Sequence, residues 1–135
     1  MKTNFDVSLQ VFKIVNTSAV KALLDGAIYR ERRRQYKTGD AFLKDISIVP
    51  LTVNGELIQQ GMVMVNCYCP DLSNGTPDID TLEAISKAVI TEFENYVQDP
   101  SEDFFHVDIA APGGVMQEKL GESYFNLRIN FNYEQ

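Results

Sequence analysis

The stretch DISIVPLTVNGELIQQGMVMVNCYC, residues 45–69, decides the fold because it reads as two β-strands joined by a tight turn. Residues 45–53 are rich in β-branched side chains, which favour a strand. Asn54-Gly55 is a strong hairpin signal, and residues 57–69 form the partner strand. We therefore predict an antiparallel pair at the centre of the protein.

Two features refine this hairpin. Pro50 cannot donate to a strand ladder, so we expect the first strand to lie at an edge or to be bulged there. Residues 62–69 are apolar on both alternating faces, which predicts a central strand with both faces covered. Pro70 should end that strand.

Helical spacing of apolar residues precedes the hairpin. Residues 6–15 repeat apolar side chains at three- and four-residue steps, which predicts a helix packed on a core. Residues 16–18 offer an N-cap for a second short helix over 19–24, and Gly26 stands where a C′ glycine would end it. Residues 27–29 are long enough for a strand stub.

The longest predicted helix runs from about Thr76 to Val97, with Thr76 as N-cap and Pro77 in the first turn. Six apolar side chains share one helical face: Ile79, Leu82, Ile85, Val89, Phe93 and Tyr96. Of these we expect four in the core: Leu82, Ile85, Val89 and Phe93. Because about twenty helical residues span roughly 30 Å, this helix can cross a sheet.

Strand patterns return after the long helix. Residues 104–110 read as a strand, Pro112-Gly113-Gly114 as a turn, and residues 125–133 alternate apolar with polar side chains. The order predicts an α+β fold: an antiparallel or mixed sheet of about four to five strands, with a long helix and a shorter N-terminal helix packed on it.

Composition fits one globular domain over residues 1–135, with 44% hydrophobic residues. Its 12 lysines and arginines against 19 aspartates and glutamates give a net charge of −7, which disfavours general binding to nucleic acid or anionic membranes. No apolar run matches a signal peptide or a membrane span, so we expect an intracellular product without membrane contact.

Positive charge is concentrated in residues 30–37, RERRRQYK, which we call the basic arm. Residues 1–44 hold nine basic and four acidic side chains, a balance of +5, so the remainder carries −12. Arginines beside a tyrosine suit pairing with carboxylate or phosphate and suit protein interfaces. The candidate partner-binding residues are Arg30, Arg32, Arg33, Arg34, Tyr36 and Lys37.

A solvated loop without a partner is the alternative interpretation of the basic arm. Self-repulsion among its arginines predicts a segment that is mobile until opposite charge reaches it. We expect serine at Arg32, Arg33 and Arg34 to leave stability nearly unchanged, because exposed charges contribute little to folding.

Side chains suited to catalysis or metal binding are sparse. The one histidine, His106, has no evident orienting partner or nucleophile, which favours a structural or surface role. Cys67, Cys69 and His106 would supply three metal ligands, whereas a structural zinc site needs four. We therefore expect reduced, metal-free cysteines packed in the sheet, no cofactor and no enzymatic activity.

Read whole, the chain resembles the tail-terminator or tail-completion proteins of long-tailed phages and prophages. The resemblance is one of order and spacing over nearly the whole chain. It is carried by Val11-Phe12, VKALLDGAIY at residues 20–29, DISI at 45–48, QQGMVMVNCY at 59–68, the helix from Thr76, and SYFNLRINF at 123–131.

This resemblance implies a structural virion-assembly protein. Members form a ring, typically a hexamer, that caps the finished tail tube and joins it to the head connector, first in the host cytoplasm and then in the virion tail. Candidate partners of the basic arm are then a neighbouring subunit, the tail-tube protein, or DNA passing through the lumen without specific binding, and we favour a protein. The alternative function is a small intracellular α+β binding or enzymatic domain whose ligand meets the basic arm and His106.

Overall fold

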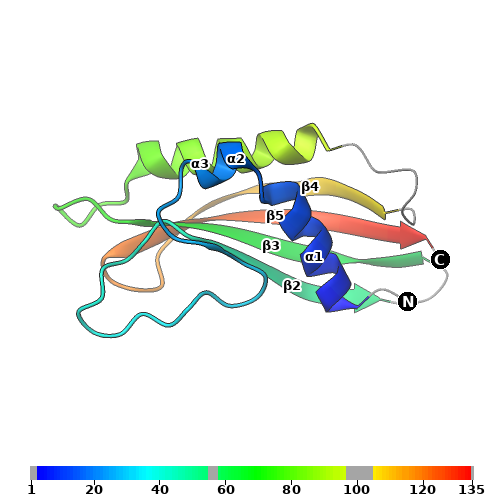
Figure 1. Ribbon diagram of the computed structural model, residues 1–135, viewed down its shortest axis with the longest axis horizontal. Helices are drawn as coiled ribbons and strands as arrows, with labels where there is room; N and C mark the ends of the chain where they lie inside the picture. Colours follow the sequence, from blue (N-terminus) through cyan, green and yellow to red (C-terminus); the bar gives the residue numbers. More distant parts are fainter. Residues whose placement is uncertain (1–2, 55–57, 97–104, 135) are drawn as a thin grey trace.

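The computed structural model describes residues 3–54, 58–96 and 105–134, and in them five strands form a mixed sheet in the order β1-β2-β3-β5-β4 (Figure 1). The strands are β1 (Ile28–Tyr29), β2 (Ile46–Asn54), β3 (Ile58–Pro70), β4 (Phe105–Met116) and β5 (Glu122–Glu134). The helices are α1 (Asn4–Val15), α2 (Ser18–Lys21) and α3 (Ile79–Glu94). The predicted α+β class is confirmed, and the sheet is mixed because β1 runs parallel to β2.

The predicted hairpin is present as the antiparallel pair β2 and β3, with Ile46 opposite Cys67 and Asn54 opposite Gln60. Its register shifts between Pro50 and Thr52, which confirms the expected bulge at the proline. The turn at Gly55 lies outside the described residues. Strand β3 is central, as predicted, since it pairs with β2 and β5 along its length.

One face of the sheet is covered by α1 and α3, and the core lies between these layers. On α3, the predicted core residues Leu82, Ile85, Val89 and Phe93 are all buried. From α1, Val7, Val11, Ile14 and Val15 are buried against the sheet. The helical periodicity therefore identified the packed faces of both helices.

The expected start of the long helix was wrong. Helix α3 begins at Ile79 and is capped by Asp78, whose carboxylate accepts hydrogen bonds from the backbone and hydroxyl of Thr81 at 3.2 and 2.8 Å. Thr76 instead donates to the side chain of Asn74 in the preceding turn. Because Asp78, further along the chain than Thr76, satisfies the first helical N–H groups, Pro77 remains outside the helix. The helix also ends earlier than expected, at Glu94 and not at Val97.

The interpretation of Pro112-Gly113-Gly114 as a turn was also wrong. Strand β4 continues through these residues with register shifts, and the chain reverses after Met116 instead. Gly113 has a φ of 75°, and a Cβ there would lie 1.3 Å from the carbonyl oxygen of Asn126. The glycine thus allows the irregular β4 backbone to approach β5 closely.

Both cysteines lie on β3 as buried free thiols, as predicted. Burial raises the pKa of Cys67 to about 12 and that of Cys69 to about 11. Neither thiol is therefore a reactive thiolate near neutral pH.

Candidate functional site

The basic arm runs along the sheet face that the helices leave uncovered. Ser47 points to this face because it alternates with the buried Ile46. Its hydroxyl donates to the carbonyl oxygen of Glu31 at 2.8 Å. Further along the arm, the guanidinium of Arg33 stacks on the ring of Tyr68. The arm is therefore attached to the sheet at two points.

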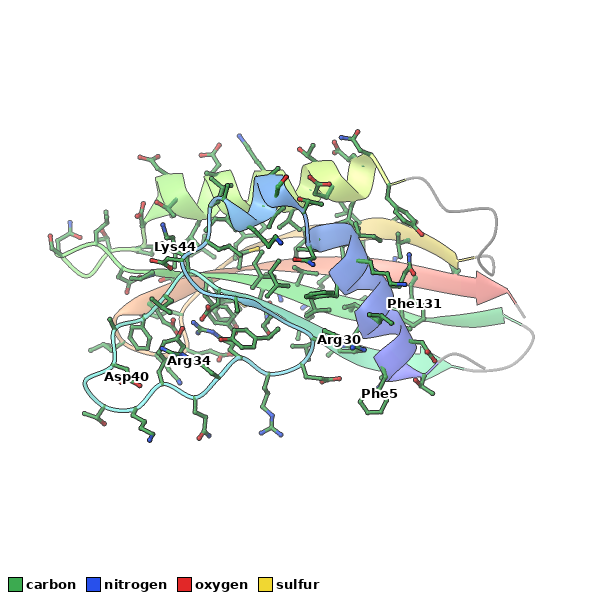
Figure 2. All side chains as sticks on the ribbon, in the orientation of Figure 1. Phe5, Arg30, Arg34, Asp40, Lys44 and Phe131 are labelled. Atoms are coloured by element: carbon green, nitrogen blue, oxygen red, sulfur yellow. The ribbon has the colours of Figure 1, made fainter. Side chains whose placement is uncertain are left out.

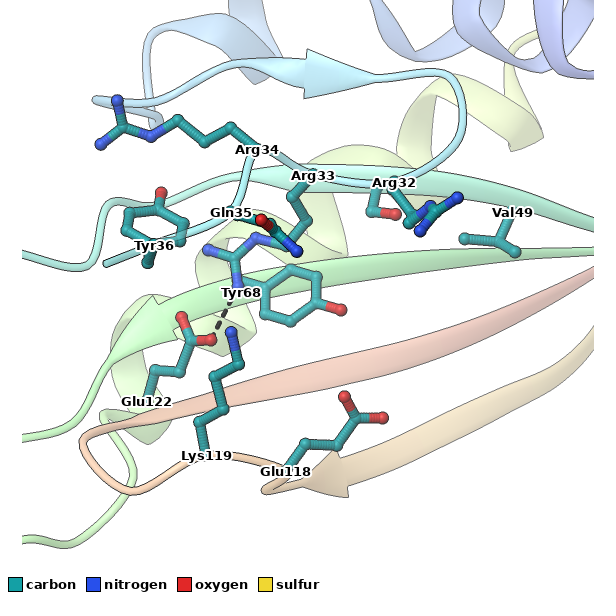
Figure 3. Close-up of a pocket in the computed structure, with 11 residues that line it drawn as sticks. Arg32, Arg33, Arg34, Gln35, Tyr36, Val49, Tyr68, Glu118, Lys119 and Glu122 are labelled. Atoms are coloured by element: carbon teal, nitrogen blue, oxygen red, sulfur yellow. Dashed lines mark hydrogen bonds and ion pairs between the residues drawn. The ribbon is translucent and has the colours of Figure 1, made fainter. Parts of the chain in front are cut away.

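Arg33 is the centre of this attachment (Figure 3). Its Nη2 lies 2.7 Å from Oδ2 of Asp45, and its Nη1 lies 2.7 Å from Oε1 of Glu122. The guanidinium carbon is 3.7 Å from the ring centroid of Tyr68 and 4.8 Å from that of Tyr36. Two carboxylates and two aromatic faces thus hold one side chain that is only 10% exposed.

Asp45 receives hydrogen bonds from both sides. Its Oδ1 accepts from the backbone of Ala27 at 3.0 Å, and its Oδ2 accepts from the Tyr36 hydroxyl and from Arg33. A Cβ on Gly26 would lie 1.7 Å from Oδ1. The expected C′ role of Gly26 is wrong: its φ is not positive, and α2 ends at Lys21. This glycine makes room for a buried carboxylate.

The electrostatics follow from this burial. Desolvation opposes the charge of Arg33, but hydrogen bonds and charge interactions with Glu122 and Asp45 outweigh it and raise the pKa of the guanidinium. Burial, together with the hydrogen bond to Asp45, raises the pKa of Tyr36. Burial likewise raises the pKa of Tyr68. These groups keep their neutral or charged states over the physiological pH range.

The six candidate residues of the arm therefore divide into two groups. Arg33 and Tyr36 hold the arm to the sheet through Asp45, while Arg32, Arg34 and Lys37 are exposed. Arg30 is exposed as well, and its Nη2 donates to the carbonyl oxygen of Phe5 on α1 at 2.9 Å (Figure 2). This last bond connects the arm to the N-terminal helix.

The expectation of a mobile arm does not fit these contacts. Opposite charge is supplied by the chain itself, from Asp45 before β2 and Glu122 at the start of β5. The expectation that serine at Arg32, Arg33 and Arg34 leaves stability nearly unchanged rests on exposed charges, and this premise is wrong for Arg33, whose side chain is only 10% exposed. Removing one partner leaves two buried carboxylates without their cation.

Sequence reasoning missed Asp45, Tyr68 and Glu122 as parts of this site. They are separated from Arg33 by 12, 35 and 89 positions, so local spacing carries no signal for their meeting. One clue was available: Asp45 is an acid immediately before an apolar strand.

A shallow pocket of about 290 Å³ lies between the arm and the β4–β5 connection (Figure 3). Its lining includes Arg32, Arg34, Tyr68, Lys119 and Glu122. Oε2 of Glu122 is buried and has no hydrogen-bond partner among the described residues. The pocket thus combines exposed cations with one unsatisfied carboxylate oxygen.

The histidine lies far from the arm. On the β4 backbone His106 pairs with Asn132, ten residues along β5 from Glu122. At about 3.3 Å per residue, this separation is roughly 33 Å. A common ligand for the arm and His106 is therefore not favoured; the side chain of His106 is outside the described part of the structure.

No family model matches this sequence, and no curated protein is significantly similar to it. Among the side chains that the structure describes, no three histidine, cysteine, aspartate or glutamate residues gather as a metal site. None of the described helices is long and apolar enough to span a membrane.

Proposed function

We propose that this protein is a structural assembly protein of a tailed phage or prophage, which forms a ring, caps the tail tube and joins it to the head connector. The resemblance over the whole chain motivates this proposal. The observation that carries it in three dimensions is the basic arm, which is held on the sheet by Arg33 and presents Arg32, Arg34 and Lys37 outward.

A fixed arm is suited to an interface because the conformational entropy of the arm is lost during folding and not when a partner binds. The internal ion pairs use Arg33, so the exposed Arg32 and Lys37 remain available to a partner. Arg34 is exposed as well, although its guanidinium carbon lies 4.7 Å from the ring centroid of Tyr36. Such exposed cations accelerate and orient association with an acidic surface. This arrangement favours a binding role for the arm over that of an ordinary solvated loop.

The partner we favour is a protein. The net charge of −7 opposes steady binding to DNA, whereas an acidic surface of a second subunit or of the tail tube complements the arm locally. Helix α3 offers such a surface within the same chain, since it contains four acidic residues and one lysine.

The proposal is tested by mixing purified protein with finished tail tubes that lack a terminator. We expect closed rings of six subunits at one tube end, seen by electron microscopy and counted by mass photometry of released rings. Tubes should then stop elongating and become competent to join heads. Bare tube ends at saturating protein would contradict the proposal.

The pocket beside the arm supports a second candidate, a small domain that binds a ligand of mixed charge. Arg32, Arg34 and Lys119 would pair with an anionic group, and Oε2 of Glu122 would accept from a cationic one. Thermal-shift screening of amino acids and other small zwitterions tests this function. Saturable stabilisation that Lys119→Ser abolishes would favour it over assembly.

A further inference from the structure

The pocket beside the basic arm has exposed cations on two of its walls. Arg32 and Arg34 line it from the arm, and Lys119 lines it from the β4–β5 connection. Figure 3 shows Lys119 extending toward the arm, whereas Arg32 and Arg34 point to opposite sides of the pocket. The exposed positive charge therefore surrounds the pocket and is not confined to the arm.

The pocket is positive although the chain as a whole carries a charge of −7. Its lining contains four cations and two acids, a balance of +2: Arg32, Arg33, Arg34 and Lys119 against Glu118 and Glu122. Counting Asp45 as well, because it pairs with Arg33, leaves a balance of +1. The charge of the pocket thus favours an anionic ligand.

Glu122 adds a requirement for a hydrogen-bond donor. Its Oε1 pairs with Arg33 at 2.7 Å, whereas its Oε2 is buried and has no hydrogen-bond partner among the described residues. The other acid of the lining, Glu118, already accepts from the Tyr124 hydroxyl at 2.9 Å. A buried oxygen without a donor is costly, so an N–H group that reaches Oε2 would be stabilised there.

We propose that this pocket binds an extended acidic segment of the partner protein. Carboxylates of the segment pair with Arg32, Arg34 and Lys119, and one backbone N–H donates to Oε2 of Glu122. This inference deepens the proposed assembly function and rests on it. It gives the partner a chemical character and adds Lys119, which lies outside the arm, to the partner-binding residues.

The directions of the cations favour a segment of chain over a small anion. Arg32 and Arg34 point apart (Figure 3), so one small anion does not meet both, whereas several carboxylates along an extended chain can. The guanidinium carbon of Arg34 lies 4.7 Å from the ring centroid of Tyr36. A guanidinium stacked on a ring still presents its N–H groups to a carboxylate. A peptide also supplies backbone N–H donors beside its acidic side chains.

An array of acetylated and amidated hexapeptides, built from Asp, Gly, Lys and Pro, tests this site while the partner is unidentified. The proteins compared are the parent, Arg32→Ser, Lys119→Ser and the control Lys13→Ser, which removes the same charge from an exposed position outside the pocket. Glu122 is left intact, because its replacement would also break the ion pair with Arg33. The tightest peptide is then methylated at each backbone nitrogen in turn, and free amino acids and oligothymidylate serve as competing ligands.

We expect the parent to bind peptides that contain two or more Asp and not their Lys counterparts. Arg32→Ser and Lys119→Ser should each weaken binding by about two- to fivefold, as expected for exposed charge pairs, and Lys13→Ser should bind as the parent does. Methylation of one backbone nitrogen should weaken binding by about tenfold, because it removes the hydrogen bond to a charged oxygen. The other methylated peptides should bind nearly as well as the unmodified one.

Acidic peptides that bind Lys119→Ser as tightly as the parent would overturn the proposal, as would equal binding of all the methylated peptides. Either result would mean that attraction to the arm alone suffices. Equally tight binding of oligothymidylate would identify a general polyanion site, and binding of free amino acids alone would identify a small-ligand site; both outcomes contradict the proposal. If tubes are capped but no acidic peptide binds, the assembly function stands and this site is wrong. If the peptides bind as expected but tubes stay bare, the site stands and the capping function is wrong.

Discussion

Arg33 and Asp45 form a buried ion pair in which Nη2 of the arginine lies 2.7 Å from Oδ2 of the aspartate. The aspartate side chain is fully buried and the arginine is nearly so. This ion pair and the second one, between Arg33 and Glu122, hold the basic arm on the sheet despite the like charges in the arm.

The first prediction separates the buried arginine from its exposed neighbours. Arg33→Ala should lower the free energy of unfolding by about 3–5 kcal/mol, because it leaves Asp45 and Glu122 buried without a cation. The double variant Arg32→Ser/Arg34→Ser should stay within about 0.5 kcal/mol of the parent, because both side chains are exposed. Urea denaturation measures both. Equal effects from the two variants would show that the ion pairs do not hold the arm.

The second prediction concerns the space beside Asp45. Gly26→Ala should destabilise the protein and release the arm, because the new Cβ would lie 1.7 Å from Oδ1 of Asp45. Gly114→Ala is the matched control, since a Cβ there meets nothing within 4 Å. Thermal unfolding of the two variants checks this difference. A Gly26→Ala protein as stable as the control would mean that the carboxylate is placed elsewhere.

The third prediction tests the placement of α3. Val89 is fully buried, so Val89→Ala should cost about 2 kcal/mol, the lower end of the range for large-to-small core substitutions. Thr91→Ala, exposed on the same helix, should change stability by less than about 0.5 kcal/mol. Chemical denaturation gives both values, and a negligible cost at Val89 would be incompatible with this packing.

The fourth prediction is a loss of stability at alkaline pH. Burial and the hydrogen bond to Glu118 raise the pKa of Tyr124 to about 12, above the value of about 10 for an unfolded tyrosine. The folded state therefore binds a proton that the unfolded state releases, and the resulting stability is complete below pH 10 and lost as the pH rises toward 12. The melting temperature should fall over that range, and Tyr124→Phe should fall less steeply. Identical slopes in the parent and in Tyr124→Phe would refute the assignment.

The periodicity of apolar residues was sufficient to predict the helices and strands that bury one face. The alternation in β5 and the helical spacing in α3 both follow from burial against the core, which repeats every two or 3.6 residues. The basic arm was also recognised, because its charge is local in the sequence.

Long-range contacts explain what the sequence did not reveal. Arg33 forms an ion pair with Glu122, which is 89 positions away in the sequence. Position 113 requires a glycine because the backbone of β5 passes close by. The sequence predicted that Gly26 ends a helix and that Gly113 lies in a turn. Each glycine is instead required by a neighbour far along the chain. Such close approaches depend on tertiary packing, which a local pattern does not encode.

The most direct test of the account is the salt dependence of binding to finished tail tubes, measured for the parent and for Arg32→Ser/Arg34→Ser. Lys13→Ser/Lys21→Ser is the control, because it removes the same charge from exposed positions outside the arm. We predict that the arm variant folds as the parent does, binds tubes more weakly at low salt, and loses less affinity as salt rises. Equal affinity and equal salt dependence for the parent, the arm variant and the control would contradict the claim that the exposed arginines of the arm bind a partner.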